Sequence, residues 1–130
     1  MADMKIHVLN VQSLLPKLPD ITADVTETEP HVLCYTETNL RSTTPNRLIS
    51  VPGYSGTIHR SDRKVGRKKC GGGVAVLVKS TIRAETLLKT SELNSSQMET
   101  VWVKVRLDQR RSLIIACIYR SPSTTAMYTD

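Results

Sequence analysis

The feature that most limits how this chain can fold is a run of five apolar residues, Val74-Ala75-Val76-Leu77-Val78, directly after three glycines. A short apolar run with β-branched side chains and a turn signal before it is typical of a central strand in a sheet. The chain has no Phe and one Trp, so its core must consist mainly of Leu, Ile and Val. Because these residues also favour extended structure, we expect a fold organised around β-sheet.

Further strands are predicted from short apolar or alternating runs at residues 5–11, 31–35, 100–107 and 112–119, with a weaker one at 54–60. The first of these strands is expected to be buried. A turn at Asp108 to Arg111 predicts an antiparallel hairpin from the last two strands.

One helix is predicted between the first two strands. Leu18, Ile21 and Val25 recur at helical spacing, and Pro30 follows, so the helix is expected over residues 18–28. Strand, helix and strand in this order form a βαβ unit. The sequence therefore predicts an α/β (α+β) fold with a mixed sheet and one flanking helix, in a single domain over residues 1–130.

Positive charge is concentrated in one segment. The chain carries +6, and residues 60–69 hold six basic residues against Asp62, which leaves 12 basic and 11 acidic residues elsewhere, or +1. The basic residues are Arg60, Arg63, Lys64, Arg67, Lys68 and Lys69. A basic loop at 61–70 could bind the backbone of a nucleic acid, or it could be the solvated tip of a hairpin.

The cysteines indicate the compartment. Cys34, Cys70 and Cys117 are odd in number and lack any C-x-x-C spacing, which indicates neither a disulfide framework nor a zinc site. The first residues contain no apolar stretch long enough for a signal peptide, and no window reaches membrane-spanning length. We expect an intracellular protein that does not enter a membrane.

Two polar residues stand where site residues of α/β proteins commonly lie, just beyond strand ends. Asn10 interrupts the end of the first strand, and Glu37 follows the second strand by two residues. If those strands are neighbours, both side chains could face one crevice, where a carboxylate would suit Mg²⁺ and an amide could orient a phosphate oxygen or the carboxylate itself. The alternatives are a solvated loop residue or helix cap for Glu37, and an amide bound to backbone for Asn10.

Four segments in the same order resemble a known family: residues 9–14 (LNVQSL), 33–38 (LCYTET), 71–75 (GGGVA) and 118–122 (IYRSP). They are similar to successive motifs of the endonuclease domain in the reverse transcriptases of non-long-terminal-repeat retrotransposons. That domain belongs to the endonuclease/exonuclease/phosphatase family, with apurinic endonucleases and deoxyribonuclease I. The resemblance extends from Lys5 to about Thr125 and implies a Mg²⁺-dependent nuclease acting on DNA, in the nucleus.

Position by position, the resemblance implies that Asn10 is an active-site residue and that Glu37 binds the metal. Tyr119 matches a tyrosine near the scissile phosphate, and Arg120 could assist in binding that phosphate. A tyrosine that covers the edge of the core, and a solvated arginine, are the alternatives. The family commonly has a second proline where Ser121 stands. The three glycines resemble a turn into a crowded strand more than a phosphate-binding loop, because no Gly-Lys-Ser/Thr follows them.

The resemblance also implies an incomplete domain. Later family segments, similar to Gly-Asp-Phe-Asn and Ser-Asp-His, do not occur before Asp130, and none of His7, His31 or His59 lies in a matching context for a general base. We therefore expect a partial β-sandwich, inactive alone, with an apolar face exposed and an unpaired edge through which copies associate. Two alternatives stay open: a nucleic-acid-binding module without catalysis, and a relative that acts on a phosphorylated small molecule or lipid.

Overall fold

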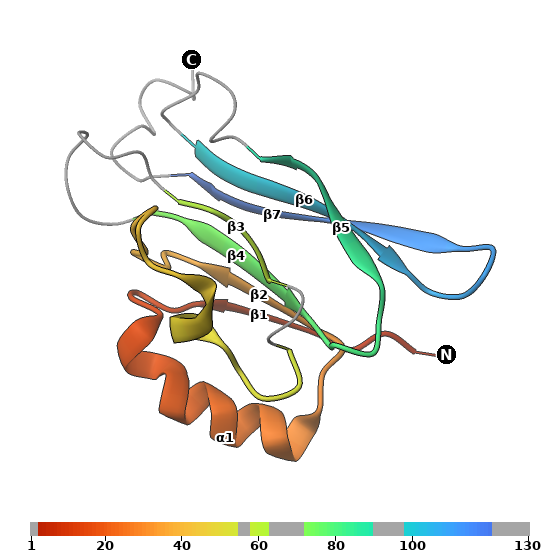
Figure 1. Cartoon of the computed structure of the whole chain (residues 1–130), viewed down its shortest axis with the longest axis horizontal. Helices are drawn as coiled ribbons and strands as arrows, with labels where there is room; N and C mark the ends of the chain where they lie inside the picture. Colours follow the sequence, from red (N-terminus) through yellow and green to blue (C-terminus); the bar gives the residue numbers. More distant parts are fainter. Residues whose placement is uncertain (1–2, 55–57, 63–71, 90–97, 121–130) are drawn as a thin grey trace.

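The computed structural model describes residues 3–54, 58–62, 72–89 and 98–120, whose strands form two sheets that lie face to face (Figure 1). Sheet A has the order β1-β2-β4-β3, and sheet B has the order β5-β6-β7. The strands of sheet A are β1 (Ile6–Asn10), β2 (Val32–Thr36), β3 (Ile58–Ser61) and β4 (Val74–Val78). Those of sheet B are β5 (Ala84–Lys89), β6 (Met98–Arg106) and β7 (Ser112–Arg120). This architecture confirms the predicted mixed α/β fold.

Helix α1 (Leu18–Thr28) covers the outer face of sheet A (Figure 1). It has the predicted bounds, because Ile21 and Val25 are buried on one side and Glu29, in a left-handed conformation with Pro30 behind it, ends the helix. Strands β1 and β2, on either side of the helix, pair in parallel, which confirms the predicted βαβ unit. Two short 3₁₀ helices also lie on this side, η1 (Leu15–Lys17) and η2 (Asn46–Ile49).

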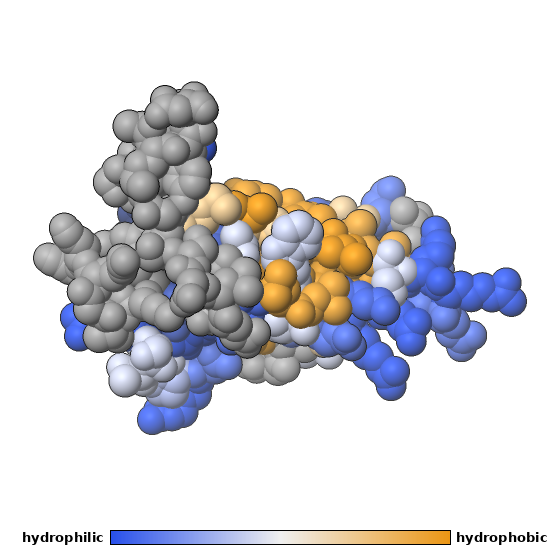
Figure 2. Space-filling model, turned by 90° about the horizontal axis from the view of Figure 1, so that it is seen from above, coloured by the Kyte–Doolittle hydropathy of each residue, from blue (hydrophilic) through white to orange (hydrophobic). Residues whose placement is uncertain are grey.

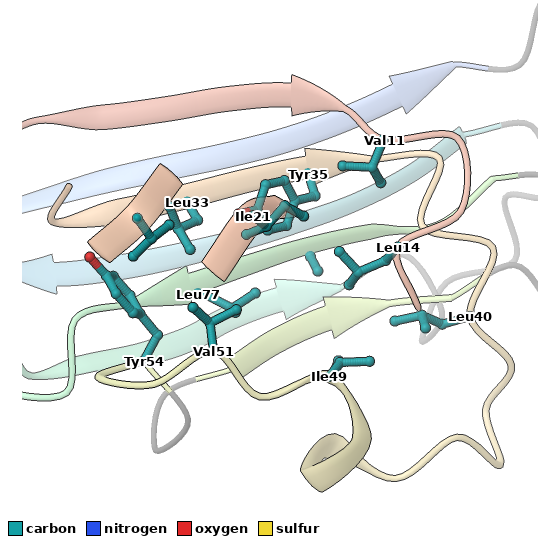
Figure 3. Packing of buried hydrophobic residues seen from close by; sticks show 12 residues of the cluster. Val11, Leu14, Ile21, Leu33, Tyr35, Leu40, Ile49, Val51, Tyr54 and Leu77 are labelled. Carbon is teal, nitrogen blue, oxygen red and sulfur yellow. The ribbon is translucent and has the colours of Figure 1, made fainter. Parts of the chain in front are cut away.

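The apolar core has two layers. One lies between sheet A and the segments that cover it, where Ile21 of α1 meets Leu33 and Tyr35 of β2 and Leu77 of β4 (Figure 3). The other lies between the sheets, where the fully buried Val76 of β4 belongs to one cluster with residues of β6 and β7. Every residue of β4 is buried, so the strand predicted to be central is covered on both faces.

The structure corrects two expectations about strands. The first strand was expected to be buried, but β1 is the edge strand of sheet A, and Val8 is 72% exposed. Strand β5 was not predicted from the sequence at all. Its register shifts between Thr86 and Leu88, which interrupts the alternation that a regular strand would show.

The predicted hairpin is confirmed. Strands β6 and β7 pair antiparallel along their whole length, from Met98 opposite Arg120 to Arg106 opposite Ser112. In the turn, the Asp108 carboxylate accepts hydrogen bonds from the backbone N–H groups of Arg110 and Arg111, both at 2.9 Å. These bonds fix the turn because they satisfy donors that the strands cannot reach.

The outer face of sheet B is apolar and exposed. Four of its large side chains form what we call the outer patch, namely Leu88, Trp102, Ile114 and Ile118, which are 38–57% exposed. Figure 2 views the molecule from the side on which sheet B lies and shows a continuous apolar area there. This observation confirms that one face is apolar and uncovered. Among the described residues, no helix has the length and apolar character needed to span a membrane.

Candidate functional site

The parallel pairing of β1 and β2 brings Asn10 and Glu37 together. Asn10 lies opposite Thr36, the residue before Glu37, and its Nδ2 donates a hydrogen bond of 2.7 Å to Glu37 Oε2. The predicted proximity of these two side chains is therefore confirmed. A carboxylate can only accept hydrogen bonds, so the amide nitrogen must face it, and a charge-assisted bond of this kind fixes the orientation of both groups.

The backbone continues the pairing beyond the strand ends. Val11 N–H donates to Thr36 O at 3.0 Å, and Ser13 N–H donates to Glu37 O at 2.8 Å. In the same two loops, Gln12, Ser13, Glu37 and Asn39 have positive φ values of 46°, 93°, 56° and 55°. A side chain at such a φ costs roughly 1–2 kcal/mol, and strained residues of this kind cluster at functional sites.

The second contact between these loops is made by side chains. Asn39 Nδ2 donates to Ser13 Oγ at 2.6 Å, in parallel with the bond from Asn10 to Glu37. One bond joins the last residue of β1 to the loop after β2, and the other joins the loop after β1 to that same loop. The carboxylate of Glu37, which is half-buried, is thus held on a backbone that is restrained on both sides.

Gly72 and Gly73, directly before β4, are hydrogen-bonded to the loop that carries Glu37. Gly72 O and Gly73 O accept hydrogen bonds from Asn39 N and Thr38 N, and Gly73 N–H donates to the buried Glu99 carboxylate at 3.0 Å. A Cβ atom at Gly73 would lie 2.5 Å from Thr38 Oγ1. For Gly72 and Gly73 the structure therefore confirms a crowded turn rather than an anion cradle, since the Gly73 N–H is already occupied. Gly71 lies outside the described residues.

Tyr119 lies at the same end of the sandwich. The carboxyl ends of β1, β2 and β7 all point to this end (Figure 1), and Cys117 Sγ donates to Tyr35 O at 3.5 Å, which places β7 over β2. Tyr119 is half-buried against the core between the sheets and pairs with Glu99. Arg120 follows on the opposite, outer face of sheet B, where its side chain is exposed. The catalytic role of Tyr119 and the phosphate-binding role of Arg120 stay predictions.

A buried ion pair near this end was missed from the sequence. Arg60 donates to Asp62 Oδ2 through Nε at 3.1 Å and Nη2 at 2.9 Å, and both side chains are only 11% exposed. Burial raises the pKa of Asp62, and the bonds from Arg60 oppose that rise. The i, i+2 spacing on a strand could have indicated the pair. Because Arg60 is bound to Asp62, its charge does not add to that of the basic segment. The other basic residues of the segment lie outside the described residues, namely Arg63, Lys64, Arg67, Lys68 and Lys69.

The residues present can supply one metal ligand. Among the described residues, no group of three His, Cys, Asp or Glu side chains lies close enough together to hold a metal ion. Mg²⁺ is commonly held by one or two carboxylates, with water and substrate phosphate as the other ligands, and Glu37 fits that mode. Glu99 does not, because it is 5% exposed and its Oε1 accepts the bond from Gly73.

The histidines offer no general base at this site. His7 Nδ1 lies 3.5 Å from Asp24, His31 Nδ1 accepts from Lys5 N–H at 2.9 Å, and His59 Nδ1 lies 2.6 Å from Thr86 Oγ1. None of these contacts involves Asn10 or Glu37. The described part of the site can orient a carboxylate and bind a cation, but it shows no group placed to activate water.

Comparison with known proteins identifies the fold. No family model matches the chain, and a search of curated proteins found no match. Among solved structures, the AP endonuclease LMAP from Leishmania major matches with a TM-score of 0.68 and 17% identity, over 96% of this chain and 44% of that one. The 3' phosphatase NExo from Neisseria, bound to a product DNA hairpin, matches with a TM-score of 0.54 and 21% identity, over 86% and 40%.

A third similar structure is named as an endonuclease/exonuclease/phosphatase family protein. An endonuclease/exonuclease/phosphatase family protein from Leptotrichia buccalis matches with a TM-score of 0.62 and 15% identity, over 98% of this chain and 64% of that one. The chain thus has the fold of endonuclease/exonuclease/phosphatase proteins and spans 40–64% of the length of these three structures.

Proposed function

We propose that this chain is part of a Mg²⁺-dependent phosphodiesterase domain that acts on DNA and derives from a retrotransposon reverse transcriptase. The observation that carries the proposal is the 2.7 Å hydrogen bond between Asn10 and Glu37 at the carboxyl ends of two parallel strands. The fold supports it, since two of the similar structures are named as an AP endonuclease and as a 3' phosphatase bound to DNA. The four ordered sequence motifs support the retrotransposon origin.

In this proposal, Glu37 would hold one Mg²⁺ through its carboxylate, with water and phosphate oxygens as the other ligands. The ion supplies charge neutralisation at the scissile phosphate when bound. Asn10 would fix the orientation of this carboxylate through the hydrogen bond from its Nδ2. Tyr119, near the end of β7, would donate a hydrogen bond from its hydroxyl to a phosphate oxygen. Activation of water and protonation of the leaving oxygen need further groups, so the chain alone is expected to be inactive.

A paired substitution tests the role of Glu37. Glu37→Gly removes the carboxylate and also relieves the left-handed backbone at φ 56°, so the variant should fold at least as well as the parent. Glu29→Gly is the matched control, because Glu29 has φ 47° at the end of α1, away from the site. DNA affinity is measured for each protein with Mg²⁺ and with EDTA at constant ionic strength.

We expect Mg²⁺ to strengthen DNA binding by the parent and by Glu29→Gly, and to have no such effect on Glu37→Gly. Plasmid nicking by the parent that disappears in Glu37→Gly would contradict the expected inactivity. Affinity that is equal with and without Mg²⁺ in all three proteins would contradict the metal role. It would favour the alternative of a DNA-binding module that acts through the basic segment.

That alternative is favoured by one specific observation. Because Arg60 and Asp62 neutralise each other in a buried pair, the local excess of +5 rests entirely on the five basic residues between 63 and 69. Neutralising Arg63, Lys64, Arg67, Lys68 and Lys69 should remove a salt-dependent DNA affinity if the segment binds phosphates. Absence of DNA binding by the parent at low salt would instead favour a phosphorylated small molecule or lipid as substrate.

A further inference from the structure

Two cysteines meet between the sheets. Cys34 lies on β2 and Cys117 on β7, and they are 4% and 5% exposed within the same core cluster. Cys117 Sγ donates a hydrogen bond of 3.5 Å to Tyr35 O, and Tyr35 is the residue beside Cys34. Because Cys34 and Cys117 are far apart in the sequence, their spacing alone does not indicate that they lie close together.

The pair lies close to solvent although both thiols are buried. Strand β7 is the edge of sheet B, and Cys34 pairs with Val8 on β1, the edge of sheet A. Paired residues of neighbouring parallel strands point to the same face, so Val8 shares the face of Cys34 but is 72% exposed. Sheet B therefore stops above β2 and leaves β1 uncovered, so a small oxidant has only one strand width to cross.

We propose that Cys34 and Cys117 form a redox-sensitive thiol pair that hydrogen peroxide converts into a disulfide between the two sheets. The Cys34 sulfur attacks one peroxide oxygen, the O–O bond breaks, and hydroxide leaves and becomes water with the proton that Cys34 releases. The Cys117 sulfur then attacks the resulting Cys34 sulfenic acid, the S–O bond breaks, and a second water leaves with the Cys117 proton. Two thiols and one peroxide give one disulfide and two waters.

The two thiols shift each other's pKa in opposite directions. The neighbouring Cys117 thiol lowers the pKa of Cys34, whereas the Cys34 thiol, together with burial, raises the pKa of Cys117. Cys34 is therefore the thiol that reacts first, since the thiolate is the nucleophile. Cys117 is the resolving thiol.

The disulfide would connect β2, which leads into Glu37, with β7, which carries Tyr119. Cys34 lies three residues before Glu37, and Cys117 lies two residues before Tyr119. A crosslink between residues so distant in sequence reduces the conformational freedom of the unfolded chain, so the oxidised protein should melt on the order of 10 °C higher than the reduced protein.

The test uses a Cys70→Ser chain, in which only Cys34 and Cys117 remain. After treatment with peroxide, free thiols are alkylated under denaturing conditions and the protein is digested without reduction. We expect a peptide pair joined through Cys34 and Cys117, with a mass about 2 Da below the sum of the two reduced peptides. The melting temperature should rise and should return to its first value with dithiothreitol.

The control carries Cys117→Ser in the same background and keeps Cys34 as the one cysteine. Its circular dichroism is compared with that of the parent, and its Cys34 should be trapped as a sulfenic acid by dimedone. Full alkylation of both cysteines in the peroxide-treated parent would overturn the proposal. So would a disulfide that forms only between molecules. These readouts do not depend on nuclease activity or on metal binding.

Discussion

Replacing Gly73 by alanine adds only one carbon atom but should clearly lower the stability of the folded protein. Its φ of +93° is one that residues with a side chain rarely adopt, and an added Cβ would lie 2.5 Å from Thr38 Oγ1. Thr38 is 1% exposed and carries the backbone that leads from Glu37 to Asn39. A substitution here therefore affects both the backbone strain and the packing below the site.

We expect Gly73→Ala to lower the free energy of unfolding by about 3 kcal/mol. Gly53→Ala is the matched control, because Gly53 has nearly the same φ of +91° but no atom within 4 Å of the added Cβ. It should cost only the backbone contribution, about 1 kcal/mol. Urea unfolding of the three proteins measures the difference, and equal costs for the two variants would show that the contact with Thr38 is harmless.

Some contacts between individual residues could be predicted from the sequence, and others could not. Asn10 and Glu37 could be predicted as a pair because each lies at the carboxyl end of a strand, and the parallel order of the βαβ unit brings such ends together. Glu99 could not be predicted as the acceptor of Gly73 N–H, since nothing local relates residues on different sheets. The same holds for the meeting of Cys34 and Cys117.

His59 connects two elements of different sheets. It lies on β3, and its Nδ1 is 2.6 Å from Thr86 Oγ1 on β5, while its buried Nε2 has no hydrogen-bond partner among the described residues. Burial lowers the pKa of His59, and the nearby Lys89 lowers it further. Protonation would therefore place an unfavourable charge at the contact between β3 and β5.

The stability of this contact should depend on pH. The unfolded chain takes up a proton at His59 near the ordinary value of 6.5, whereas the folded protein takes it up only at lower pH. The contribution of His59 is thus complete above pH 6.5 and is lost as the pH falls through its folded pKa. We expect urea unfolding to show a larger loss of stability between pH 7.5 and 5.5 for the parent than for His59→Gln. An equal loss in both would exclude His59 as the cause.

Strand prediction failed where the tertiary environment overrides the local pattern. The apolar residues of β1 indicated burial, but the strand lies at the edge of sheet A, because sheet B does not extend over it. Strand β5 pairs with β6 through an irregular register, so its sequence does not alternate. Strand β4, which is paired and covered on all sides, was predicted with its observed bounds.

On the scale of the whole molecule, the outer patch of sheet B is an apolar surface that the described fold leaves uncovered. Trp102, Ile114 and Ile118 are 38%, 57% and 48% exposed on adjacent strands. A contiguous apolar surface of this kind promotes association in water. We propose that copies of this chain associate through it.

Replacing Ile114 and Ile118 by Thr should reduce association and leave the fold intact, because Thr keeps the β-branched shape that strands favour. Leu48→Thr is the control, since Leu48 is also 49% exposed but lies on η2, on the other side of the molecule. Sedimentation velocity over a range of concentrations measures the effect. A parent that stays monomeric and unfolds reversibly in one cooperative transition would contradict the proposal.

Local patterns along the chain were enough to specify the separate elements: the helix between Leu18 and Thr28, the central strand β4, the hairpin of β6 and β7, and the polar residues at two strand ends. These follow from periodicity and turn residues, which act over a few positions along the chain. The packing of the two sheets, by contrast, sets which strands lie at edges, which thiols meet and which backbone N–H group the Glu99 carboxylate binds. Those features depend on contacts between residues far apart in sequence, and such contacts form when the two sheets pack together.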